Sequence, residues 1–133
     1  KCPMTLSSFC DFVDSFEKGG VELFREEHAD GEKYFWQLVS NAILLEVDFA
    51  ELIVYCPYQR ELEEIRELAS SVDSADQFKY LWIYNAQDEE LPHLIEGKHY
   101  KNLYIFRFEI PASDKLFLTN RIIEAEKQLI TIK

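Results

Sequence analysis

The sequence predicts an α/β fold in which helices flank a small mixed sheet. Three observations support this class. The chain has 133 residues, which suits a single domain, and 47% of them are hydrophobic, enough for a core. It has only four glycines and four prolines, so most of it should be regular structure. Two apolar runs of strand character lie among segments with helical periodicity.

The N-terminal segment predicts two helices, at about 5–18 and 20–27. Thr5 is a suitable N-cap, and Gly19-Gly20 ends the first helix. A turn follows at 28–31. The apolar stripe of the first helix consists of Leu6, Phe9, Cys10, Val13 and Phe16.

The segment at 32–47 predicts a helix that is apolar around most of its circumference, which is typical of a buried helix. Gln37 and Asn41 lie four residues apart, with Ser40 beside them, and form a single polar stripe. Buried polar side chains need partners. We therefore expect this stripe to face either a polar network or a cleft.

Residues 49–55 predict a buried strand, because the run is apolar and β-branched and ends at Cys56-Pro57. A helix at about 58–71 follows, with glutamates that we expect to point into solvent and to pair locally with Arg60 and Arg66. The residues expected to face inward are Leu62, Ile65, Leu68 and Ala69, and the outward glutamates are Glu61, Glu63, Glu64 and Glu67.

The remaining elements are less uniform. Residues 73–86 suit either a helix or a strand, and the capping residues at the start of this segment favour a helix. The segment at 87–100 predicts a polar loop. A strand is expected at 102–110, with Arg107 and Glu109 on its wetter face. Its inward residues are Tyr104, Phe106, Phe108 and Ile110, and a last helix at about 114–130 carries the stripe Leu118, Ile122, Ala125 and Leu129. Two strands are few for this many helices, so we expect further strands before Lys1.

Charge and motifs exclude several function classes. The net charge of −11 argues against an independent nucleic-acid-binding module. There is no phosphate-binding glycine loop and no zinc or hydrolase motif. His28, His93 and His99 are expected at the surface, and the three cysteines are expected to be reduced thiols. The expected reduced thiols favour a cytoplasmic location, and no apolar run is long enough for a membrane span, so the sequence predicts a soluble, cytoplasmic protein.

One combination of motifs resembles a known family. Lys1-Cys2-Pro3 precedes a capped helix, then a helix that opens Tyr34-Phe35-Trp36-Gln37, and then the strand that ends Val54-Tyr55-Cys56-Pro57. This order is similar to the second half of a PD-(D/E)XK nuclease core, in the branch of phage lambda exonuclease and the related viral recombinases. The resemblance covers about 1–58 by motif and 102–130 by pattern.

The resemblance implies an incomplete restriction-endonuclease-like core, with 1–133 as the C-terminal part of a single nuclease domain. Lys1 would be the catalytic lysine of Glu-x-Lys, close to Gln37, which would reach the active site or the DNA backbone. Tyr34 and Asn41 are candidates for the lining of the substrate cleft. The Asp and Glu that hold Mg²⁺ or Mn²⁺ would precede Lys1, so the fragment should bind no metal and be inactive alone. DNA and possible identical subunits would be partners of the full protein.

Two other functions fit parts of the sequence. The acidic helix at 58–71 and the acidic loop at 87–90 suit a non-catalytic interaction module that docks a basic partner, such as a single-strand annealing protein. A small-ligand domain would instead use the region of Trp82 and Tyr84 as an apolar wall.

Overall fold

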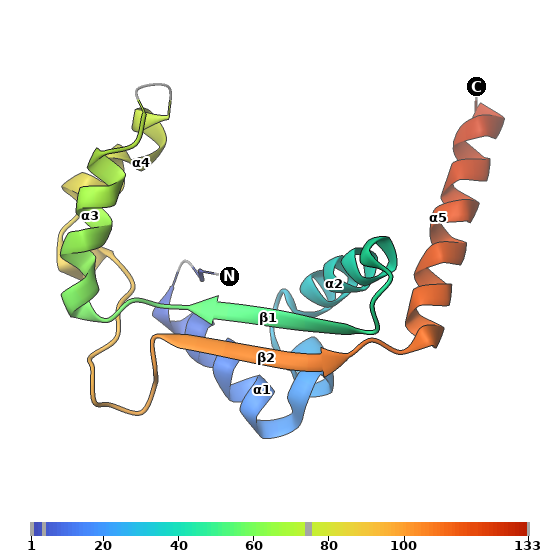
Figure 1. Cartoon of the computed structure of the whole chain (residues 1–133), viewed down its shortest axis with the longest axis horizontal. Coiled ribbons are helices and arrows are strands. Elements are labelled where there is room, and N and C mark those ends of the chain that lie inside the picture. Colours follow the sequence, from blue (N-terminus) through green and yellow to red (C-terminus); the bar gives the residue numbers. More distant parts are fainter. Residues whose placement is uncertain (1, 4, 74–75, 133) are drawn as a thin grey trace. The chain divides into compact units, whose positions relative to one another are not determined.

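The computed structural model describes residues 2–3, 5–73 and 76–132 (Figure 1). These residues form a mixed α/β arrangement of five helices and two strands, with short 3₁₀ turns at Gln59–Glu61 and Asp88–Glu90. The chain divides into two compact units. Unit 1 comprises Lys1–Val13 and Ile53–Ile105, and unit 2 comprises Asp14–Leu52 and Phe106–Lys133. The elements are α1 (Leu6–Glu27), α2 (Gly31–Leu45), β1 (Phe49–Tyr55), α3 (Leu62–Ser70), α4 (Gln77–Asn85), β2 (Leu103–Glu109) and α5 (Ala112–Ile132).

Strands β1 and β2 pair in a two-stranded antiparallel sheet, and each unit contains one half of the pairing (Figure 1). In unit 1 the Cys56 N–H donates to the Asn102 carbonyl at 2.9 Å, and in unit 2 the Ile110 N–H donates to the Asp48 carbonyl at 2.7 Å. Exposed and half-buried residues alternate along β2, which confirms the predicted faces of this strand. The two described strands are antiparallel to each other, whereas the sequence predicts a mixed sheet.

The core of unit 1 forms around the first turns of α1 and the inward face of α3. Thr5 Oγ1 accepts the Ser8 N–H at 3.1 Å, which confirms the predicted N-cap. Phe9 is fully buried and its ring lies edge-on to that of Tyr100, at 6.1 Å between centroids. The predicted inward position of Leu68 is wrong, since that side chain is 61% exposed. Helix α4 packs against α3, and the buried stripe of α3 is centred on Leu62 and Ala69, about a third of a turn away.

Unit 2 includes the bend of α1. Gly19 and Gly20 have non-helical backbone angles, and Gly20 has a φ of +68°, so the two predicted helices join across a kink. Phe16, just before the kink, stacks on Phe24 after it, at 4.6 Å between ring centroids. The glycine pair therefore turns the helix so that both of its parts contribute aromatic rings to one core.

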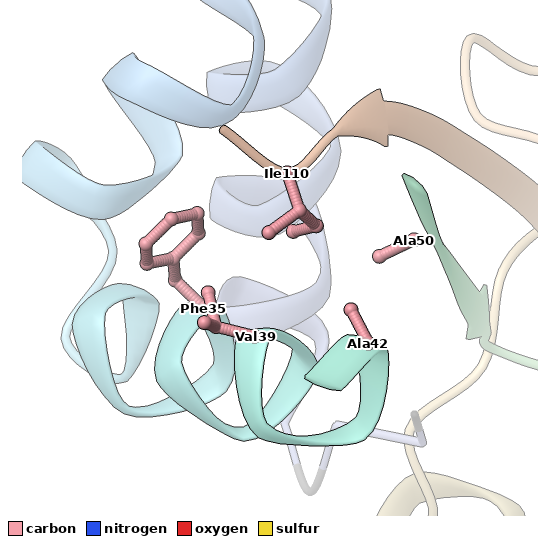
Figure 2. Close-up of a cluster of buried hydrophobic side chains, with 5 residues drawn as sticks. All are labelled: Phe35, Val39, Ala42, Ala50 and Ile110. Atoms are coloured by element: carbon pink, nitrogen blue, oxygen red, sulfur yellow. The ribbon is translucent and has the colours of Figure 1, made fainter. Parts of the chain in front are cut away.

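Helix α2 supplies the central buried cluster of unit 2. Phe35, Val39 and Ala42 lie on one face of the helix at helical spacing, and their side chains point towards Ala50 and Ile110 (Figure 2). The expectation that α2 is buried on nearly all sides is wrong, because Leu44 is 78% exposed and Leu45 is 72% exposed. The buried face of α2 packs on the strands, and α5 contacts part of a second face. Among the described residues, these contacts leave Leu44 and Leu45 exposed at the end of the helix.

Among the residues that the structure describes, no helix has both the length and the apolar character that crossing a membrane requires.

Candidate functional site

An open groove in unit 2 runs along α2 and α5 and has a volume of about 630 Å³. Its floor is apolar, from Trp36, Leu118 and Ile122, while α2 provides a polar rim. The rim consists of Lys33, Gln37, Ser40 and Asn41. Gln37 and Asn41 are exposed and lie one turn apart, so the polar stripe of α2 lines a cleft and not a buried network.

The first turn of α2 is held by a compact set of contacts. Arg25 donates two hydrogen bonds to Glu32, at 2.7 and 3.3 Å, and its guanidinium lies 3.9 Å from the centre of the Phe35 ring. The indole N–H of Trp36 donates to Glu32 at 2.9 Å. The bonds from Arg25, with a further contribution from Trp36, hold the pKa of Glu32 below its usual value although burial opposes them. These contacts orient Trp36 on the groove floor, where its ring lies 5.5 Å from that of Phe117 in α5.

The groove can donate hydrogen bonds but offers no carboxylate. Its rim presents an ammonium, two carboxamides and a hydroxyl, which suit anionic oxygen atoms such as those of a phosphodiester. Mg²⁺ prefers carboxylate oxygens, and the groove lining includes neither Asp nor Glu. The described residues also contain no cluster of three His, Cys, Asp or Glu side chains arranged for a metal ion. The groove residues therefore do not fit a magnesium site.

The structure brings only some of the predicted site residues together. Gln37 and Asn41 share the groove. Tyr34 is not among the residues that line it, and its ring stacks on Phe24 at 6.5 Å and lies 6.3 Å from His28. Lys1 lies outside the described residues, so its proximity to Gln37 stays a prediction. The predicted surface position of His28 is wrong: this ring is buried beside Phe24, and its Nδ1 accepts the Asp30 N–H.

Glu61 in unit 1 is a hydrogen-bonding centre that the sequence reasoning missed. Its carboxylate accepts the Tyr58 N–H at 2.7 Å, the Asn102 amide at 3.1 Å and the Tyr55 hydroxyl. Burial raises the pKa of Glu61, but these donors outweigh it and lower the pKa overall. The predicted solvent-facing orientation of Glu61 is therefore wrong. Glu61 follows Tyr58 by three residues at the start of a helical turn, and this spacing, which is that of a capping box, is the sequence signal that could have revealed its role.

The arginines of this region also reach further than predicted. Arg60 pairs with Glu96 at 2.7 Å, and Arg66 pairs with Asp88 and donates to the Ala86 carbonyl at 3.1 Å. The bond from Arg66 holds the pKa of Asp88 below its usual value. The predicted local pairing is confirmed only for Arg66 with Glu63, at 3.6 Å. These longer contacts connect α3 and the 3₁₀ turn before it to the chain after α4.

Comparison of the chain with family models, curated proteins and solved structures finds no match. The chemistry of the described side chains therefore carries the functional argument. Thiol chemistry is a weak candidate, because burial, with smaller effects from neighbouring acidic groups, raises the pKa of Cys56 to about 11. Among the described residues, Cys2, Cys10 and Cys56 form no disulfide. The groove on α2 is the candidate site with the clearest match between residue types and a ligand.

Proposed function

We propose that the chain is the C-terminal portion of a metal-dependent DNA exonuclease of phage or prophage type, with a restriction-endonuclease-like core. The full protein would hydrolyse phosphodiesters during recombination or repair in the cytoplasm. The observation that carries this proposal is the position of Gln37, which α2 presents on an open groove with Asn41 one turn away. A glutamine satisfied inside the core would have favoured a purely structural role.

The groove residues suit the binding of a DNA backbone. The carboxamides of Gln37 and Asn41 can donate to non-bridging phosphate oxygens, and Lys33 places a positive charge on the same rim. Trp36 gives the floor an apolar surface on which a sugar can rest. This local chemistry differs from the chain as a whole, which has a net charge of −11. The favourable contacts are therefore concentrated on one face of α2.

The proposal assigns the metal to residues outside this chain. Mg²⁺ or Mn²⁺ would be held by an Asp and by the Glu of Glu-x-Lys, both preceding Lys1, and would activate the attacking water. The residues of this chain would bind and orient the phosphodiester. The chain alone should consequently hydrolyse no DNA.

The first test is the sequence upstream of Lys1 in the gene that encodes the chain. The proposal requires a Glu at the second position before Lys1 and an Asp earlier in the same domain. A stop codon or a start codon directly before Lys1, or an upstream segment without these carboxylates, would overturn the assignment.

The second test is a nuclease assay of that longer protein on linear duplex DNA with Mg²⁺. We expect Gln37→Ala to lower kcat/KM by about tenfold or more, because the substrate loses a positioning contact. Gln128→Ala is the matched control: Gln128 is an exposed glutamine on α5 that does not line the groove, and its removal should leave the rate unchanged. Equal rates for the two variants would remove Gln37 from the site.

A further inference from the structure

Helix α4 in unit 1 exposes an unusual amount of apolar surface for its length. Of its nine residues, five are large apolar or aromatic side chains that are at least 41% exposed. Proteins in water rarely leave so many large apolar side chains together unless the surface binds something. We call this surface the aromatic face of α4, and it consists of Phe78, Tyr80, Leu81, Trp82 and Tyr84.

The aromatic face is held on a fixed support. Helix α4 packs alongside α3 (Figure 1). Arg66 of α3 donates to the Ala86 carbonyl at the end of α4 and pairs with Asp88 just beyond it. At the other end, Lys79 pairs with Asp76 at 3.0 Å. A partner would therefore meet a preformed surface and would not have to order the helix itself.

The surroundings of the aromatic face are strongly acidic. Residues 62–90 contain eight acidic and two basic residues, a net charge of −6. Both basic residues, Arg66 and Lys79, are already in ion pairs. Where α4 ends, Tyr84 lines an open hollow of about 400 Å³ together with Glu63, Asp88 and Glu89, and Arg66, which pairs with Glu63 and Asp88, belongs to the same lining. Three carboxylates against one guanidinium leave the hollow acidic, and the Tyr84 ring suits the apolar stem of a lysine or arginine whose cationic head meets the acidic side chains.

We propose that the aromatic face of α4 binds a basic, amphipathic segment of another protein, with apolar side chains against Phe78 and Trp82 and cationic side chains against the carboxylates of α3 and the loop after α4. The charge selects this occupant among the alternatives. A second copy of the chain would bring another net charge of −11 to the surface, and a nucleic acid would bring phosphates. The inference does not depend on nuclease activity.

The test uses the full 133-residue chain and a fluorescent helical peptide of about 18 residues, built from leucine on one face and lysine and arginine on the other. We expect saturable binding that weakens as salt rises from about 0.05 to about 0.5 M. Trp82→Ala and Phe78→Ala should each weaken binding about tenfold, because aromatic anchors dominate such interfaces. Glu64→Gln combined with Glu67→Gln should weaken binding by a smaller factor and reduce its salt dependence.

The controls separate this surface from general attraction to an acidic protein. Ile130→Ala removes a similarly exposed apolar side chain from α5, and it should leave the affinity unchanged. A peptide of the same composition without an apolar face should bind at least tenfold more weakly. The proposal is overturned if Trp82→Ala binds normally, if the rearranged peptide binds as well, or if a single-stranded oligonucleotide binds more tightly than the peptide. Self-association that Trp82→Ala abolishes would overturn it in favour of a second copy.

Discussion

Unit 2 is held by stacked rings, whereas unit 1 relies to a larger extent on a polar network. In unit 2, Phe16 stacks on Phe106 at 4.5 Å between centroids, and Phe35 joins the buried cluster between α2 and the strand ends. In unit 1, Glu61 and Arg66 each connect segments that lie more than twenty residues apart in the chain. Both units have apolar cores, and unit 2 also has long-range ion pairs, Lys115 with Asp48 and Arg107 with Glu51, but these are exposed. The long-range contacts of Glu61 and Arg66 in unit 1 are partly buried.

This difference separates two kinds of sensitivity. Apolar packing is non-directional and responds to changes in volume. A charged hydrogen-bond network depends on particular donors and on the protonation of its acceptor. Unit 2 should therefore be sensitive to cavities and added methyl groups, and unit 1 to charge and pH.

The largest expected effect is a cavity in unit 2. Phe35→Ala should lower the free energy of unfolding by about 3–5 kcal/mol, because Phe35 is 2% exposed and packs among Phe108 and Val39. The matched control is Phe78→Ala in unit 1, where an 87% exposed ring is removed and a change within about 0.5 kcal/mol is expected. Urea denaturation measures both. Similar losses for the two variants would show that Phe35 is not in a packed core.

A smaller effect is expected from adding one methyl group. In Gly31→Ala, an added Cβ would lie 2.2 Å from the Phe24 carbonyl oxygen and 2.9 Å from Arg25 Cα, backbone atoms that have little room to move. We expect a loss of about 2–3 kcal/mol. Gly97→Ala in unit 1 is the comparison: nothing lies within 4 Å of its added Cβ, but its φ of +83° should cost about 1 kcal/mol. Thermal unfolding would contradict this account if Gly97→Ala were the more damaging change.

The smallest of the three effects is in the polar network and depends on pH. Glu61→Gln should lower the free energy of unfolding by about 1–2 kcal/mol at neutral pH, because a charged acceptor is lost. Although burial raises the pKa of Glu61, the hydrogen bonds that its carboxylate accepts hold this pKa below its usual value in the folded chain. The stabilisation by Glu61 is therefore complete above that usual value and is lost as the pH falls through the folded-state pKa.

The free energies of unfolding of Glu61→Gln and of the unchanged chain should consequently converge in acid. Glu64→Gln, at an exposed position on α3, is the matched control and should change the free energy of unfolding by less than about 0.5 kcal/mol at neutral pH. A difference between Glu61→Gln and the unchanged chain that does not shrink as the pH falls below the usual pKa of a glutamate would contradict an ionised Glu61.

Much of the local structure follows from the sequence. The strand predicted at 49–55 is β1, because an apolar, β-branched run next to Cys56-Pro57 has few alternatives. The expectation that this strand is buried is wrong for one of its faces, since exposed and buried residues alternate along it. The break at Gly19-Gly20 and the cap at Thr5 are also confirmed. The segment at 73–86 was ambiguous because aromatic residues suit both helices and strands; the helix that the capping residues favoured forms at Gln77–Asn85.

The candidate site was only partly accessible to this reasoning. Spacing placed Gln37 and Asn41 on one stripe of α2, but the choice between a cleft and a buried network depends on where α5 packs. The exposure of Leu44 and Leu68 likewise depends on which neighbours cover each helix. Spacing within one helix cannot supply that information.

What the sequence by itself determined is most of the elements, their limits to within a few residues and the polar stripe on α2, because periodicity, caps and glycine pairs act within a few residues. The tertiary structure decided the partners. The carboxylate of Glu61 meets Asn102, 41 positions further along the chain, and Arg66 meets Asp88, 22 positions away. It also left α4 with an open aromatic face beside acidic residues. Hydrogen bonds and burial depend on distance in space, which the packing of the whole chain sets.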